Sequence, residues 1–148
     1  MESIRTSATC LALLLGLLVA VAARAEIGQV KFVAGEVQVQ RGETRLVAAP
    51  GLGLQQADVV ITGEDGRIGM TFKDNSRFSA GPNSTLELAT FRFDTTTHQG
   101  RFISRLRRGT LAVSSGQLAK QGEDQMEVHT PTSILGVRGT YFLVEVAP

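Results

Sequence analysis

IGMTFKDNSRF, residues 68–78, predicts a β-hairpin with one buried face. Ile68, Met70 and Phe72 alternate with small, polar or charged residues, and this period of two is typical of a half-buried strand. The turn-forming pair Asp74-Asn75 follows at once and lets the chain reverse. The hairpin therefore indicates a sheet protein whose strands each turn one side toward an apolar core.

The length of this turn fixes which side chains share a face. A two-residue loop would send Phe72 and Phe78 to opposite faces, because paired residues share a face. A three-residue loop, 74–76, pairs Phe72 with Phe78 and buries both rings in one core. Burial is worth roughly 1.5 to 3 kcal/mol for each ring, so we predict the three-residue loop. Asn75 or Ser76 is then expected at positive φ.

The same alternation recurs along the rest of the chain, whereas helical periodicity is hard to find. Turn-forming residues separate the alternating runs at spacings of about ten residues. This pattern predicts an all-β domain, either a single antiparallel β-sandwich or a β-helical roll, and alternation alone does not distinguish the two. The further alternating runs are 36–40, 86–89, 111–114 and 126–129.

The N-terminal residues 1–25 are predicted to form a helical signal peptide. Arg5 supplies a positive region, 11–23 is an apolar run, and Ala23-Arg24-Ala25 is an A-x-A cleavage site. The strongly apolar part is shorter than the roughly 20 residues that span a bilayer. We therefore expect a cleaved, periplasmic domain of residues 26–148, with an uncleaved inner-membrane anchor as the alternative.

The predicted exported domain contains no cysteine and carries no net charge. Cys10 lies in the signal peptide, so a disulfide or a thiolate metal site is excluded after cleavage. Without Arg5, Arg24 and Glu2, the 15 basic and 14 acidic residues of the chain fall to 13 of each. This balance and the exported location argue against a nucleic-acid partner.

No residue pattern points to an enzyme, a metal or another cofactor. The two histidines, His98 and His129, lack metal-ligand spacing. No G-x-S-x-G sequence selects a nucleophilic serine. The acidic pairs 64–65 and 123–124 lie beside glycines, as in solvated turns. We therefore expect no catalytic activity.

A row of basic side chains is the strongest candidate for a partner surface. Arg101, Arg105 and Arg107 lie on one side of a predicted strand, with apolar residues on the other side. Such a row can hold an acidic protein, a lipid phosphate or a carboxylated polymer. An edge strand protected by charge explains the same pattern and is the favoured interpretation. Ile103, on the arginine side, favours a partner surface.

The end of the chain resembles the closing motif of the FecR-like domain. Thr130-Pro131 is followed by Gly136, Val137, Arg138, Gly139 and Thr140 and then by a hydrophobic strand. The resemblance covers about residues 57–147. Positions 57 and 75, where the family commonly has glycine, are Ala57 and Asn75, which are turn substitutions. Further matches are 58–62, 72–76 (with Asp74 and Asn75), 82–86 and 106–109.

The resemblance implies an all-β periplasmic domain. Its best-known members belong to single-span inner-membrane regulators that control an extracytoplasmic-function sigma factor. Their periplasmic part receives a signal from a TonB-dependent outer-membrane receptor during iron uptake. About ten residues precede the apolar run here and none follows Pro148. We therefore expect a stand-alone domain that lacks the sigma-binding segment and the receptor-docking module.

The two glycines of the closing motif suggest a role for its arginine. Gly136 and Gly139 allow the backbone to bulge or to approach a neighbouring strand. Arg138 is expected to clamp unpaired carbonyls or a carboxylate, with ligand capture as the second hypothesis. Thr140 is expected to begin the last strand, whose alternate residues 142, 144 and 146 face the core.

Two functions follow from these observations. The first is a non-catalytic protein-interaction, signalling or scaffold module that binds another envelope protein. The second is a binding module for an anionic glycan or lipid. One tyrosine and no tryptophan offer few stacking surfaces for sugar rings, which disfavours the second function.

Overall fold

The computed structural model describes residues 24–139 and 141–148, so the predicted signal-peptide helix lies outside the described residues. The described residues form twelve strands and one short 3₁₀ turn, as the alternation predicted. These are β1 (Glu26–Ala34), β2 (Val37–Arg41), β3 (Thr44–Val47), β4 (Gly53–Gln55), β5 (Val59–Thr62), β6 (Arg67–Phe72), β7 (Arg77–Ala80), β8 (Thr85–Phe93), β9 (Gly100–Ser114), η1 (Leu118–Lys120), β10 (Met126–His129), β11 (Ile134–Gly136) and β12 (Tyr141–Val146).

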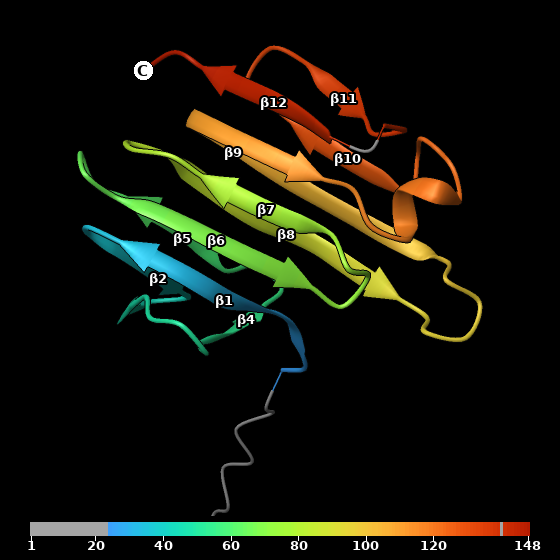
Figure 1. The fold of residues 1–148 in the computed structure, drawn as a ribbon, viewed down its shortest axis with the longest axis horizontal. Coiled ribbons are helices and arrows are strands. Elements are labelled where there is room, and N and C mark those ends of the chain that lie inside the picture. The colour runs from blue at the N-terminus through green and yellow to red at the C-terminus, as the bar shows by residue number, and fades with distance from the viewer. Residues whose placement is uncertain (1–23, 140) are drawn as a thin grey trace, which may run out of the picture.

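The strands belong to one sheet that curls into two layers (Figure 1). The β6 layer has the order β4-β1-β6-β7-β9-β12, and the β8 layer has the order β3-β2-β5-β8-β9-β10-β11. Strand β9 takes part in both layers. The architecture is thus one curled sheet. It has two layers like the predicted sandwich, and it is continuous through β9 like the predicted roll.

One pair of strands corrects the expectation of a purely antiparallel sheet. Strands β9 and β10 run parallel, with Met126 opposite Phe102 and His129 opposite Arg105. A parallel pair needs a crossover of about a dozen residues, and residues 115–125, which include η1, supply it. Alternation in the sequence therefore predicted the strands, but it did not predict whether paired strands run parallel or antiparallel.

Strand β9 passes from one layer to the other at Gly109. Residues up to Arg108 pair with β8, whereas residues 109–114 pair with β12 and residues 111–114 also with β7. Gly109 has φ of 92°, and a Cβ atom there would collide with Ser84. Glycine is needed at this point because it alone combines a positive φ with so close an approach.

The turn between β6 and β7 has the predicted length but a different register. Phe78 pairs with Met70 instead of Phe72, so the pairing is displaced by two residues. Because a displacement of two residues keeps every side chain on its face, both phenylalanines are still buried, at 2 % and 0 % exposure. The loop consists of 73–75, and Asn75 has φ of 66°, as predicted for this residue.

Asp74 explains why the turn closes one residue earlier than expected. One carboxylate oxygen accepts hydrogen bonds from the backbone N–H of Ser76 at 3.1 Å and from its hydroxyl at 2.6 Å. The N–H of Phe72 also donates to the carbonyl of Ser76 at 2.9 Å. Asp74 and Ser76 are fully buried, so the turn places a hydrogen-bonded polar pair within the core.

Aromatic rings from both layers meet in the core. Ring centroids of Phe72 and Phe102 lie 4.7 Å apart, and those of Phe91 and Phe102 lie 5.0 Å apart. Phe78 stacks on Phe102 at 5.0 Å. The rings come from β6, β7, β8 and β9, so this cluster holds the two layers together.

The two ends of the curled sheet are built differently. At the closed end, residues 48–52 connect β3 to β4 and bond to both β2 and β1, with the N–H of Ala48 reaching Val37 at 3.0 Å and the N–H of Val30 reaching Leu52 at 2.9 Å. Leu54 is fully buried there. At the open end, β11 and β12 are the last described strands of their layers.

Candidate partner surface

The three arginines of the predicted row lie on the outer face of the β8 layer. Arg101, Arg105 and Arg107 belong to β9, and their side chains are 53 %, 51 % and 62 % exposed. Phe102 and Leu106 point the other way and are fully buried, as the alternation predicted. The arginine face is defined as these three side chains and the carboxylates they contact.

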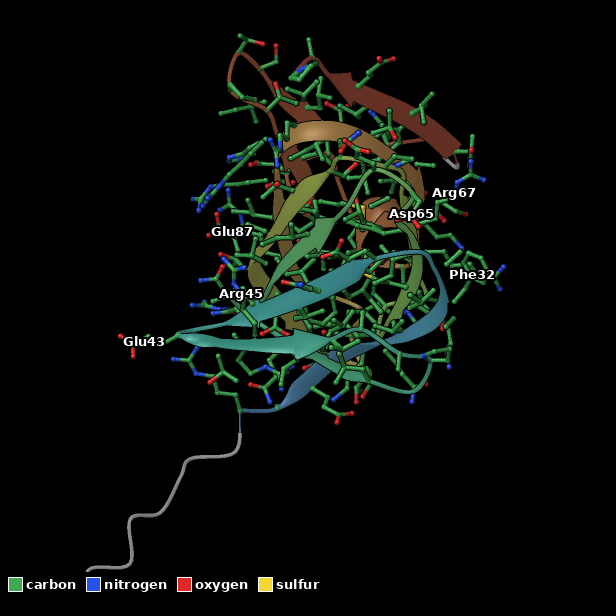
Figure 2. All side chains as sticks on the ribbon, turned by 90° about the vertical axis from the view of Figure 1, so that its left-hand side faces the viewer. Phe32, Glu43, Arg45, Asp65, Arg67 and Glu87 are labelled. Atoms are coloured by element: carbon green, nitrogen blue, oxygen red, sulfur yellow. The ribbon has the colours of Figure 1, made fainter. Side chains whose placement is uncertain are left out.

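Figure 2 places the two outer faces of the molecule on opposite sides. Glu87, which contacts the arginine row, projects on the same side as Arg45. Phe32 and Arg67 project on the other side, from the β6 layer. The outer face of the β6 layer therefore provides sites for control substitutions that lie away from the arginine face.

The alternative explanation of the row, an edge strand protected by charge, applies to only part of it. Strand β9 pairs with β8 along the row, and from Phe102 to Arg105 it also pairs with β10 on the other side. This part has no free backbone groups to protect, so edge protection does not explain Arg105. Arg107 lies beyond the last β10 pair, so edge protection still applies there.

The arginine face carries more positive than negative groups. Glu87 accepts from Arg105 at 3.3 Å and from Arg107 at 2.9 Å. Glu127 pairs with Arg101 at 3.3 Å and lies 2.7 Å from the His129 ring. Exposed pairs of this kind contribute at most about 1 kcal/mol each, so the guanidinium groups can exchange them for a carboxylate or phosphate of a partner.

A groove of about 490 Å³ runs beside the arginines. Arg105, Arg107 and His129 line it together with residues 130–133. The hydroxyl of Thr130 accepts from the N–H of Ser133 at 3.0 Å, which closes this segment into a turn. The Thr-Pro corner and the arginine row were separate features in the sequence, and the parallel pairing of β9 with β10 brings them together.

The closing motif is anchored by its valine. Val137 is 2 % exposed, and its N–H donates to the carbonyl of Met126 at 2.9 Å. The Arg138 side chain is 79 % exposed and pairs with the Glu123 carboxylate at 3.3 Å. The carboxylate contact expected of the arginine clamp is therefore present, but a pair between two exposed side chains contributes little to stability. Thr140 lies outside the described residues.

The glycines of this motif also differ from each other. A Cβ atom on Gly136 would lie 3.0 Å from the carbonyl oxygen of Glu123, so this glycine does allow a close approach. A Cβ atom on Gly139 would meet no atom within 4 Å. The predicted close approach thus holds at Gly136, and at Gly139 it is the backbone carbonyl that approaches a neighbour, because it accepts a hydrogen bond from the Ser115 hydroxyl.

Residues 58–148, more than half of the chain, match the family described as FecR protein. The chain belongs to the FecR protein family. FecR domains are signalling-related modules associated with the bacterial envelope. A search of curated proteins and a search of solved structures each find no match.

Two positions where the FecR family commonly has glycine adopt the expected backbone. Ala57 has φ of 73° and Asn75 has φ of 66°, and both lie in turns. Asparagine tolerates this left-handed conformation, whereas alanine is strained in it. The substitutions therefore keep the turns of the FecR fold, and Ala57 does so at a cost in stability.

An ion pair that sequence reasoning missed lies at the start of the FecR match. Asp58 is 1 % exposed and accepts two hydrogen bonds from Arg41, at 2.9 and 2.7 Å. It also accepts from the N–H of Gln55 at 2.9 Å, and Arg41 donates to the carbonyl of Gly53 at 2.8 Å. The hydrogen bonds that Arg41 donates to the Asp58 carboxylate raise the pKa of Arg41 above its usual value. The pair ties β2, β4 and β5 together at the closed end.

Within residues 24–139 and 141–148, no group of three or more His, Cys, Asp or Glu side chains is arranged to hold a metal ion. No helix in the same ranges has the length and hydropathy to cross a membrane.

Proposed function

We propose that this FecR protein is a non-catalytic interaction module of the periplasm that binds another envelope protein through the arginine face. The observation that carries the proposal is the exposed row of Arg101, Arg105 and Arg107 on one outer face, where β9 has neighbouring strands on both sides from Phe102 to Arg105. Membership of a signalling-related envelope family supports a role in which binding transmits a signal or holds an assembly together.

The chemistry of the face indicates an acidic partner. Two carboxylates, Glu87 and Glu127, serve three guanidinium groups, so the surface keeps an excess of positive charge. A partner carboxylate can replace Glu87 on Arg105 or Arg107 with little loss, because exposed pairs are weak. Complementary charge also accelerates encounter, and this acceleration falls as salt increases.

The test is capture of crosslinked partners from the native envelope with the full chain and a charge-reversal variant. Arg105→Glu with Arg107→Glu reverses the arginine face. Arg67→Glu with Arg77→Glu makes the same change in charge on the opposite face, where both arginines are exposed. We expect a specific protein to be captured by the wild type and by the control variant and to be lost from the arginine-face variant.

Thermal melts of both variants show whether each folds. If both variants are folded and capture the same proteins as the wild type, the arginine face is not the binding surface. If the wild type captures no specific protein at low salt, the protein-interaction function is wrong.

A second candidate function is supported by the groove beside the row. Arg105, Arg107 and His129 line a space that fits a phosphate or a carboxylated sugar. Vesicles of phosphatidylglycerol and an acidic polysaccharide such as alginate are suitable probes of anionic lipid and glycan. Binding of either probe that is lost with Arg105→Glu and Arg107→Glu, and retained with Arg67→Glu and Arg77→Glu, would favour this function over a protein partner.

A further inference from the structure

The open end of the sheet presents an unpaired edge. Among the described residues, β12 pairs only with β9, and β11 pairs only with β10. A cleft of about 350 Å³ lies between the two strands, lined in part by Val137, Phe142 and Val144. Four of the six large apolar side chains that are exposed in the described structure lie on these two strands, namely Ile134, Leu135, Tyr141 and Leu143.

Strand β12 lacks the features that usually protect an edge. Its sequence, YFLVEV, contains one charged residue, Glu145, and neither lysine nor proline. Its six residues pair with β9 in one unbroken register, without a bulge. Edge strands are commonly protected by charge, proline, bulges or a cover, so a regular apolar edge indicates a surface that another strand occupies.

The backbone groups that β12 leaves free can be assigned from its neighbours. The carbonyl of Thr110 accepts from the N–H of Gly81 at 3.1 Å, so the even-numbered residues of this part of β9 bond toward β7. Backbone groups alternate sides along a strand, so the odd-numbered residues bond toward β12. Val113 and Leu111 are opposite Phe142 and Val144, which therefore bond to β9.

Tyr141, Leu143 and Glu145 consequently point their N–H and C=O groups toward the free edge. We propose that this edge pairs with β12 of a second copy of the chain, antiparallel and centred on Leu143. In this register Leu143 lies opposite itself and Tyr141 lies opposite Glu145 of the second copy. All three pairs are of the type that exchanges both N–H···O bonds, because each member offers its free backbone groups.

The side chains of β12 are self-complementary in this arrangement. Glu145 faces Tyr141 of the second copy, so the two Glu145 carboxylates are not opposite each other and do not repel. On the inner side, Phe142 lies opposite Val144, and the two apolar side chains extend the core across the joint. A two-fold axis through Leu143 uses the whole strand, whereas any other antiparallel register leaves part of it unpaired.

The outer face of the β6 layer leads to the same edge. A row of facing residues crosses the layer from Phe32 through Gly69, Ser79 and Ala112 to Leu143. The two ends of the row are large and exposed, at 54 % for Phe32 and 64 % for Leu143, and the residues between them are small. Pairing at β12 joins the rows of two copies at Leu143 and removes its side chain from water.

The pairing surface is distinct from the arginine face, so the inference and the proposed function can fail separately. The first experiment measures the mass of the purified full chain by sedimentation between about 1 and 100 μM, a range in which interfaces of ordinary affinity associate. We expect a monomer–dimer equilibrium. Leu143→Lys places two ammonium groups opposite each other and should raise the dimer dissociation constant at least about tenfold.

A crosslinking experiment tests the register. In a Cys10→Ser background, Leu143→Cys places thiols of the two copies opposite each other, and a short bismaleimide should join them into a covalent dimer. Phe32→Cys is the matched control, because Phe32 is similarly exposed at the far end of the same row. We expect this control to remain monomeric under the reagent.

Both experiments have outcomes that overturn the inference. A wild-type chain that stays monomeric at every concentration excludes the second copy. A dimer that survives Leu143→Lys, or equal crosslinking of the two cysteine variants, excludes β12 as the site. If the purified chain is monomeric and an envelope protein is lost from the Leu143→Lys variant, the edge belongs to a different partner and the inference is wrong.

Discussion

The closed end and the open end of the curled sheet differ in how well their edge strands are covered. Each end has strands with a neighbour on one side only. At the closed end, residues 48–52 cross between the layers and bond to β1 and β2, and the Arg41–Asp58 pair fixes β4 and β5 against β2. At the open end, residues 137–139 follow β11 and bury Val137, but four large apolar side chains of β11 and β12 remain exposed.

This contrast assigns different tasks to the two ends. Buried and fully paired groups such as Asp58 contribute to stability, because removing them leaves partners unsatisfied. Exposed groups such as Leu143 contribute little to the stability of one chain and are free to contact another. Substitutions at the closed end should therefore affect folding, and most substitutions at the open end should affect association.

The largest expected effect is at the closed end. Asp58→Ala should lower the free energy of unfolding by roughly 3 to 5 kcal/mol, because it leaves Arg41 without its carboxylate in a partly buried site. Urea denaturation measures the loss. The control is Glu123→Ala, which removes the exposed carboxylate of the Arg138 pair and should cost less than about 0.5 kcal/mol. Equal losses for both variants would remove the distinction between the ends.

A smaller effect is expected where the open end does contribute to folding. Val137→Ala should lower the free energy of unfolding by about 1.5 to 3 kcal/mol, because Val137 is the buried member of its motif. Urea denaturation of Val47→Ala provides the comparison, since Val47 is 81 % exposed at the closed end and should tolerate the change. A Val137 variant as stable as the wild type would show that the motif is not anchored by this side chain.

The third substitution should increase stability. Ala57→Gly relieves a left-handed backbone at an alanine and should raise the free energy of unfolding by about 0.5 to 1 kcal/mol. Ala112→Gly, in the extended strand β9, should lower it by a similar amount, because glycine there only adds freedom to the unfolded chain. Thermal melts compare the two. A loss of stability with Ala57→Gly would contradict the assignment of strain to this turn.

The smallest effect is expected at the arginine of the closing motif. Arg138→Met should change the free energy of unfolding by less than about 0.5 kcal/mol, because both Arg138 and Glu123 are largely exposed. A thermal melt is sufficient to measure this. A loss of about 2 kcal/mol or more, the scale of a hydrogen bond to a charged group, would support the clamp role of Arg138.

The sequence predicted those features that depend on alternation within one strand. It placed Phe72 and Phe78 in one core and put the three arginines on one exposed face. It also gave Asn75 or Ser76 as the residue at positive φ, and Asn75 is that residue. These features are local, because the pleat of a strand sends alternate side chains to opposite faces wherever the strand lies. The FecR resemblance, which rests on the order of several motifs, was also readable from the chain and is confirmed.

The remaining features depend on which strands become neighbours. Alternation does not say that β9 and β10 run parallel, and only that pairing brings Thr130 and His129 beside Arg105. Alternation also does not predict the exposure of Arg138, because that exposure depends on which segments pack over the closing motif. The local pattern along the chain thus set which face each side chain takes. The tertiary structure set the partners across each face, the register of the hairpin and the free edge of β12, because long-range pairing is chosen by the packing of the whole sheet and not by any one strand.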